Sequence, residues 1–182
     1  MADIAVEPVI FDVDAAGLRA RYGEFVALLD DAVTGGASVG FMLPIPSREI
    51  AGHWHGISAE LDRGLRRLLA CERDGRIVGA VQVAFCSKDN GRHRAEIEKL
   101  LVLRAARRQG IGAALMCAAE DVARKHGRWL LLLDTREDSA GEKLYRQLGW
   151  RPFGQVGNYA RDPDGTLAGC VFFVKELDGA HP

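Results

Sequence analysis

The sequence is poor in the features that tie a protein to a membrane, to nucleic acid or to an oxidising compartment. No apolar run reaches the roughly 18 to 20 residues that a membrane-spanning helix needs. The N-terminus lacks the basic and then apolar pattern of a secretory signal. Lysine and arginine (24) nearly balance aspartate and glutamate (25), so no excess positive charge attracts nucleic acid or an anionic membrane. We therefore expect a cytoplasmic protein with neither partner.

Cysteine is scarce, and its four copies form no CxxC pair. Each lies among apolar neighbours, which predicts reduced and mostly buried thiols at Cys71, Cys86, Cys117 and Cys170. The close histidine pair, His53 and His55, has no cysteine pair beside it, so we expect no metal site.

The chain has 182 residues, 48% apolar and 27% charged, which predicts a single domain over 1–182 with its own core. An Asp-Gly pair at 74–75 indicates a hairpin, and one strand–helix–strand crossover follows it. We expect an α+β fold whose mixed, mostly antiparallel sheet of about seven strands carries helices on both faces. Apolar periodicity places strands near 9–13, 65–73, 76–86, 93–103, 129–133, 151–159 and 169–177, and helices near 14–31, 47–62, 110–126 and 139–148.

Three local patterns refine these elements. Ser47 is a plausible N-cap for the second helix. The continuous apolar run over 129–133 suggests a strand buried on both faces, with Asp134 at its end. Ser139 with Glu142 fits a capping box at the start of the last helix.

The most informative stretch is the glycine turn over 107–112, which follows a strand and opens a helix. A helix N-terminus presents unpaired N–H groups and the positive end of the helix dipole, and glycines let a phosphate approach the backbone. Arginines nearby suit bidentate phosphate binding. The alternative is a tight turn with an exposed basic face, but the arginines before a strong helix favour an anion site.

Two known phosphate-binding motifs fit this stretch poorly. A P-loop would need Lys after the last glycine, where Ala113 stands. A Rossmann fingerprint gains support from Asp134, placed as a ribose-binding acid would be, but Leu115 occupies the position of its third glycine. Too little chain follows Asp134 for the rest of a doubly wound sheet.

A third motif fits well. The segment Arg107-Arg108-Gln109-Gly110-Ile111-Gly112 resembles Arg/Gln-x-x-Gly-x-Gly/Ala, the pyrophosphate-binding motif of the GNAT superfamily of acetyl-CoA-dependent N-acetyltransferases. The stretch 139–150 is similar to the family's A-x-x-L-Y-x-x-x-G-F helix, and the likeness covers about 92–153. Arg104 departs from it, since it stands where proline is common. Short segments at 35–42, 94–96 and 133–135 resemble the tabtoxin-resistance acetyltransferases.

This resemblance implies the GNAT fold and acetyl-CoA as co-substrate. It implies that the backbone of Leu100, Leu101 and Val102 pairs with the pantetheine arm as an added strand would. Asp138 stands where many members carry an Asn that touches the cofactor. The resemblance places the pyrophosphate on Arg107, Arg108, Gln109, Gly110, Ile111, Gly112 and Ala113.

Acetyl transfer needs a neutral attacking amine and a proton for the leaving thiolate. Tyr145 holds the family's tyrosine position and is the candidate acid; Asp134 is the leading base, and Glu96 matches a base position in some members. No placed cysteine nucleophile is apparent, so direct attack is preferred. The structural alternatives are that Tyr145 is a core aromatic residue, that Asp134 caps a helix or braces a loop, and that Glu96 and Glu98 lie on a solvated strand face.

The acceptor predicted from the resemblance is a primary amine of a small molecule, an amino-acid-like toxin or antibiotic, which would make resistance the role. The second helix at 53–55 and the loop 35–42 are candidates for the acceptor pocket. A protein or peptide N-acetyltransferase and a non-catalytic acyl-CoA-binding domain stay open as alternatives. The sequence leaves the oligomeric state open, a homodimer included.

Overall fold

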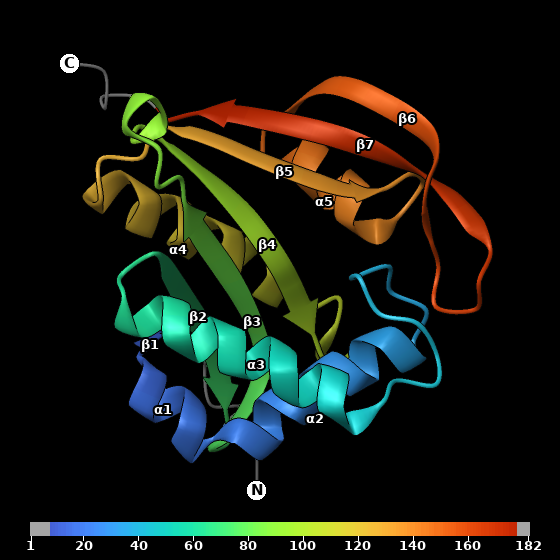
Figure 1. The fold of residues 1–182 in the computed structure, drawn as a ribbon. Helices are drawn as coiled ribbons and strands as arrows, with labels where there is room; N and C mark the ends of the chain where they lie inside the picture. The colour runs from blue at the N-terminus through green and yellow to red at the C-terminus, as the bar shows by residue number, and fades with distance from the viewer. Residues whose placement is uncertain (1–7, 178–182) are drawn as a thin grey trace, which may run out of the picture.

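The computed structural model describes residues 8–177, which form one seven-stranded sheet with strand order β1-β2-β3-β4-β5-β7-β6 (Figure 1). The strands are β1 (Val9–Val13), β2 (Arg66–Arg73), β3 (Arg76–Phe85), β4 (Arg94–Val102), β5 (Leu130–Arg136), β6 (Arg151–Arg161) and β7 (Leu167–Glu176). The helices are α1 (Ala15–Ala20), α2 (Tyr22–Thr34), α3 (Ser47–Asp62), α4 (Ile111–Lys125) and α5 (Ala140–Gln147). Strands β4 and β5 pair in parallel and the other described pairs are antiparallel, which confirms the predicted α+β sheet.

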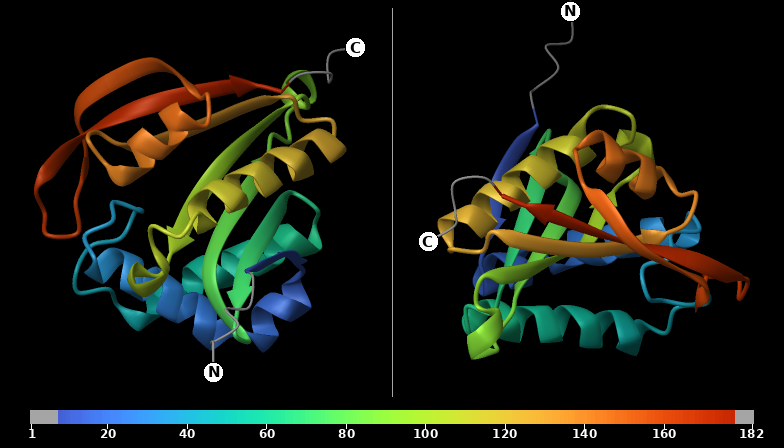
Figure 2. Two further views of the ribbon diagram at one scale, coloured as in Figure 1. Left: turned by 180° about the vertical axis from the view of Figure 1, so that it is seen from behind. Right: turned by 90° about the horizontal axis from the view of Figure 1, so that it is seen from above.

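Helices cover both faces of this sheet, as predicted (Figure 2). One core cluster lies under α1, α2 and α3, where Phe25 and Trp54 pack with ring centroids 5.2 Å apart. The other lies under α4 and α5, where Leu115 and Phe173 are completely buried. The sheet is therefore sandwiched between two apolar layers, apart from its edge strand β6, in which every residue is exposed.

The first predicted helix is two helices in the structure. The expected helix over 14–31 breaks at Arg21 (φ −110°, ψ 22°), and α2 then continues to Thr34. The Arg21 guanidinium binds Glu24 and Glu72 and donates to the Gly75 carbonyl at 3.1 Å. These contacts bind the break to the β2–β3 hairpin, a tertiary interaction that helical periodicity does not report.

Three smaller predictions also need correction. Ser47 is the first helical residue of α3, whose N-cap is Pro46 without a side-chain hydrogen bond. The apolar run does not end its strand, because β5 continues through Asp134 to Arg136, and its two faces differ: Leu131 and Leu133 are buried while Leu130 and Leu132 are half-buried. All four cysteines are free thiols, but Cys117 is exposed and Cys86 is half-buried.

The feature that positions the candidate site is the divergence of β4 from β5 (Figure 1). The two strands pair only through the register partners Arg94–Leu130, Ala95–Leu131 and Glu96–Leu132. Beyond Glu96, β4 carries a bulge: Lys99 has φ +49°, and the register against β3 shifts there. The rest of β4 therefore has one backbone edge without a β5 partner.

Candidate active site

The glycine turn places an uncapped helix N-terminus beside that unpaired edge of β4. Gly110 is the N-cap of α4 and has φ +80°, a left-handed conformation that L side chains rarely adopt. Among residues 8–177 no side chain caps this N-terminus, and none lies within 4 Å of a Cβ built on Gly110. The first-turn N–H groups of α4 are thus without a side-chain acceptor from the described residues, a geometry compatible with the predicted anion site.

Only some of the basic side chains around this turn are free to bind an anion. Arg108 is exposed with φ +64°, and no described residue pairs with its guanidinium. Arg107 donates from Nε to the Val102 carbonyl at 3.1 Å, which leaves its other nitrogens open. Arg104 instead binds Asp31 of α2 at 2.9 Å, so it braces the turn against α2.

The remaining predicted cofactor residues differ in whether their side chain or only their backbone is free to contact a ligand. The Gln109 side chain binds Arg73, and the Ile111 side chain is buried in the core, so these two residues offer their backbone. Gly112 allows close packing of α4 on α5, since a Cβ there would lie 3.3 Å from Leu144 Cδ2. Asp138 is exposed with φ +59°, and its N–H donates to Glu142 at 2.7 Å.

Leu100, Leu101, Val102 and Ala113 lie close to the divergence. Leu101 and Val102 pair with β3 through Ala80 and Gly79, so their strand stays extended beyond the bulge. Leu100 is half-buried and packs toward α4, and Ala113 is half-buried in the first turn of that helix. An extended ligand could add to this edge as a strand, with its anionic end at α4.

Asp134 lies on the part of β5 that has already left β4. Its carboxylate is exposed and accepts a hydrogen bond from the Cys170 thiol at 3.4 Å. Burial, together with the Asp134 charge, raises the pKa of Cys170 to about 12. Cys170 therefore stays protonated and is unsuited to be a nucleophile, in agreement with direct attack. No local pattern predicts this contact, because Cys170 and Asp134 meet only through the β5–β7 pairing.

Tyr145 comes from α5, on the opposite side of the sheet. Its ring packs against Trp150 and Phe173, at centroid distances of 6.3 and 6.1 Å, and the side chain is 8% exposed. Burial and then the charge of Asp134 raise its pKa above the usual value of 10. The phenol is thus protonated across the neutral range, and it lies within electrostatic reach of Asp134. The structure brings these two predicted residues together.

Glu96 shares a face with Asp134. Glu96 is the register partner of Leu132, and Leu132 and Asp134 are two residues apart on one strand, so all three side chains lie on the same side of the sheet. Phe172 of β7 is the register partner of Asp134 and joins them there. We call this surface, carrying Glu96, Asp134 and Phe172, the carboxylate face. Glu98 also points to this side but is held by Arg66 at 2.8 Å.

Two loops approach the carboxylate face from different parts of the chain. The N–H of Leu43, in the segment between α2 and α3, donates to the Pro163 carbonyl in the β6–β7 turn at 3.0 Å. That turn is anchored to β5 by Arg136, whose Nε lies 2.8 Å from Asp162. Tyr159 stands edge-on to Phe172 with centroids 5.2 Å apart. The predicted loop 35–42 is therefore held near β5, β6 and β7.

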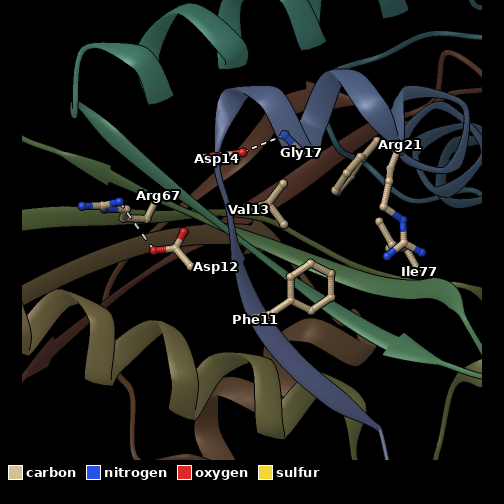
Figure 3. A pocket seen from close by; sticks show the side chains of 9 residues that line it. Phe11, Asp12, Val13, Asp14, Gly17, Arg21, Arg67 and Ile77 are labelled. Atoms are coloured by element: carbon tan, nitrogen blue, oxygen red, sulfur yellow. Dashed lines mark hydrogen bonds and ion pairs between the residues drawn. The ribbon is translucent and has the colours of Figure 1, made fainter.

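A cavity of about 380 Å³ lies elsewhere, between β1 and α1 (Figure 3). Asp12 and Arg67 form an ion pair of 3.5 Å at its wall, and Arg21 is held by its own carboxylate partners. These charges are already compensated within the protein, so we assign no reaction to this cavity. Among residues 8–177 no cluster of His, Cys, Asp and Glu suited to a metal ion is present, and no helix is long and apolar enough to cross a membrane.

Comparison with known proteins decides the family. The model of the Acetyltransferase (GNAT) family matches residues 43–150, more than half of the chain. The chain belongs to the GNAT acetyltransferase family. This confirms the predicted family and the acyltransferase class, and it fits acetyl-CoA as the co-substrate.

Relatives agree with this assignment. Two curated relatives come from Azospirillum brasilense. An uncharacterized N-acetyltransferase of the hisH-hisA intergenic region is 34% identical over 59% of this chain and 64% of its own length. An IAA acetyltransferase is 35% identical over 53% of this chain and 62% of its own length. The alignments thus span less than two thirds of each relative. The solved structure of yncA from Salmonella typhimurium with acetyl-CoA has a TM-score of 0.76 at 20% identity, covers 97% of this chain and 96% of its own, and shows the same fold. None of these three tests the finer likeness to tabtoxin-resistance enzymes, which stays a prediction.

Proposed function

We propose that this GNAT protein transfers the acetyl group of acetyl-CoA directly to a primary amine of a small molecule. The observation that carries this proposal is the meeting of Asp134, Tyr145 and the uncapped N-terminus of α4 around the divergence of β4 from β5. The relative named IAA acetyltransferase favours a small acceptor over a peptide. A toxin or antibiotic as acceptor, and action in the cytoplasm, are the finer parts of the proposal.

The residues present fit acetyl-CoA. The open N–H groups of Gly110 to Ala113 and the guanidinium of Arg108 would hold the pyrophosphate, and the unpaired edge of Leu100 to Val102 would hold the pantetheine arm. When bound, acetyl-CoA supplies an activated thioester. Asp138 is exposed near the start of α5 and stays a predicted cofactor contact.

The two proton transfers of the reaction, from the incoming ammonium and to the departing sulfur, would use side chains on opposite sides of the sheet. Asp134 or Glu96, on the carboxylate face, would take the proton from the incoming ammonium. Tyr145, on the α5 side, would donate its hydroxyl proton toward the departing sulfur. The raised pKa of Tyr145 keeps that proton in place until it is needed.

A thiol-release assay with acetyl-CoA over a panel of small amines and peptides tests the proposal. Turnover of small amines supports it, turnover of peptides alone would favour a protein N-acetyltransferase, and acetyl-CoA binding without any turnover would indicate a non-catalytic acyl-CoA-binding domain.

A pair of substitutions at Gly110 tests the pyrophosphate site. Asp and Asn both tolerate a left-handed backbone better than most residues, and a Cβ there has open space, so the two variants differ mainly in charge. Gly110→Asp should weaken acetyl-CoA binding by about 2 kcal/mol or more, because a carboxylate opposes the pyrophosphate, and Gly110→Asn should weaken it much less. If calorimetry gives the two variants equal affinities for acetyl-CoA, the pyrophosphate does not bind at this turn.

A further inference from the structure

His53 has a buried nitrogen with no partner. It lies on α3, with its ring edge-on to Phe41 at a centroid distance of 5.5 Å. Its Nε2 is buried and has no hydrogen-bond partner among residues 8–177. Because buried polar atoms nearly always have a partner, this nitrogen marks a place where a bound molecule would supply one.

Lys99 lies close to His53 and is also unpaired. The bulge in β4 turns its side chain toward the segment between α2 and α3, where a Cβ built on Gly40 would lie 3.9 Å from its Nζ. No described residue forms an ion pair or hydrogen bond with this ammonium. Burial, and then the charges of Lys99 and Arg66, lower the pKa of His53 to about 4. His53 is therefore neutral at neutral pH, and Lys99 is within electrostatic reach of it.

The neighbouring arginine, in contrast, has its partners within the protein. Arg66 binds Glu60 at 2.6 Å, Glu98 at 2.8 Å and Gln82 at 2.7 Å. Lys99 is thus the uncompensated cation at this end of the carboxylate face, while Glu96 and Asp134 have no cationic partner in the described part of the chain. The face carries unpaired charges of both signs.

We propose that Lys99 and His53 form a subsite for an anionic group of the acceptor, so that the acceptor is an amine that also carries a carboxylate or similar oxyanion. This rests on the proposed function, since Glu96 and Asp134 would receive the amine. The Lys99 ammonium donates a charge-assisted hydrogen bond to one oxygen, and neutral His53 donates from Nε2 to another. Lys99 is the third residue after Glu96 on β4, so at most about 10 Å of backbone separates them, which limits the length of the acceptor.

The experiment measures the binding and turnover of amino acids, each paired with its uncharged primary amide. Alanine, β-alanine and γ-aminobutyrate are each compared with their primary amides, by calorimetry on the CoA-saturated protein and by thiol release with acetyl-CoA. We expect the acid to bind at least about 10-fold more tightly than its amide at the chain length that fits. Lys99→Met should reduce this preference to about 2-fold or less, and Lys99→Arg should retain most of it. His53→Phe should weaken binding of the acid more than His53→Gln, which keeps an N–H group.

Lys125→Met is the matched control, because Lys125 is exposed at the far end of α4 and its loss should leave the preference unchanged. The subsite is overturned if the wild-type protein shows no preference for acid over amide, or if Lys99→Met keeps the preference. Acetylation of amines without an acid preference would refute the subsite and leave the proposed function intact. Acid-selective binding without product from these compounds or from any amine of the wider panel would refute the proposed function and support the subsite.

Discussion

Deleting a single hydroxyl at Tyr145 separates catalysis from packing. The ring is 8% exposed and packs on Trp150 and Phe173, contacts that Tyr145→Phe keeps. The hydroxyl has no hydrogen-bond partner among the described residues, so its loss should change the free energy of unfolding by less than about 1 kcal/mol. If the hydroxyl protonates the leaving sulfur, kcat should fall by roughly 10²-fold, which corresponds to about 2.7 kcal/mol of barrier.

The assay is thiol release at saturating acetyl-CoA and acceptor, with acetyl-CoA affinity measured by calorimetry. Tyr22→Phe is the matched control, since Tyr22 lies on α2 and is 39% exposed, so it should keep full kcat. An acetyl thioester with a better leaving group should lose less rate in Tyr145→Phe, because its sulfur needs less protonation. Since the pKa of Tyr145 is raised, the wild-type kcat should show no loss from this group up to about pH 9.

One result would refute this reasoning. If Tyr145→Phe retains full kcat with acetyl-CoA while acetyl-CoA binding is unchanged, Tyr145 is a packing residue and another donor or water protonates the sulfur. A loss confined to acetyl-CoA affinity would equally remove the acid role, because it would assign the hydroxyl to binding.

The remaining predictions concern the base, the core and acid stability. Asp134→Asn or Glu96→Gln should lose kcat/KM mainly near neutral pH and recover as the pH approaches the amine's own pKa; a loss equal at all pH values would withdraw the base role from that residue. Gly79→Ala should lower the free energy of unfolding, measured by urea denaturation, by about 1–3 kcal/mol. The reason is that the added Cβ would lie 3.0 Å from Leu115 Cδ1 and 3.1 Å from the Leu101 carbonyl oxygen. An unchanged free energy of unfolding would show that the core accommodates the extra methyl group. Burial, then Lys99 and Arg66, lower the pKa of His53 to about 4, so between about pH 6.5 and 4 the unfolded chain binds the proton more readily than the folded protein. The free energy of unfolding of the wild type should therefore fall with acidification more than that of His53→Gln. Parallel stability curves from about pH 7 to pH 5 would contradict this.

Local patterns in the sequence were sufficient for the elements whose causes are local. The Asp74-Gly75 hairpin has the two positive φ angles, 52° and 73°, that its turn requires. Ser139 caps α5 by accepting from the Glu142 N–H at 3.0 Å, as the capping box predicts, but Glu142 accepts in return from the Asp138 N–H and not from that of Ser139. The break at Arg21 could not be predicted, since its cause is a guanidinium bound across more than fifty residues of sequence to Glu72.

The same distinction holds for the site. Spacing predicts the glycine turn, because a helix N-terminus is a local pattern, whereas Tyr145 is predicted from the resemblance of its helix to the family's; the roles of both stay predictions. The bulge at Lys99, the thiol on Asp134 and the unpaired nitrogen of His53 depend on which strands and helices become neighbours. Strand pairing therefore determines the part of the site that spacing could not predict.

The exposed edge strand β6 shows how the fold discourages growth of its sheet. An eleven-residue strand with one free edge is a template on which a second chain could pair and aggregate. Pro152 offers no N–H to such a chain, and two register irregularities, between Pro152 and Gly154 and between Val156 and Ala160, interrupt the flat ladder that a stack of strands requires. Arg151 and Arg161 place a positive charge at each end, so two copies of this edge would repel one another. Strand β6, whose Tyr159 packs against Phe172 of the carboxylate face, is thereby also protected against self-association along its edge.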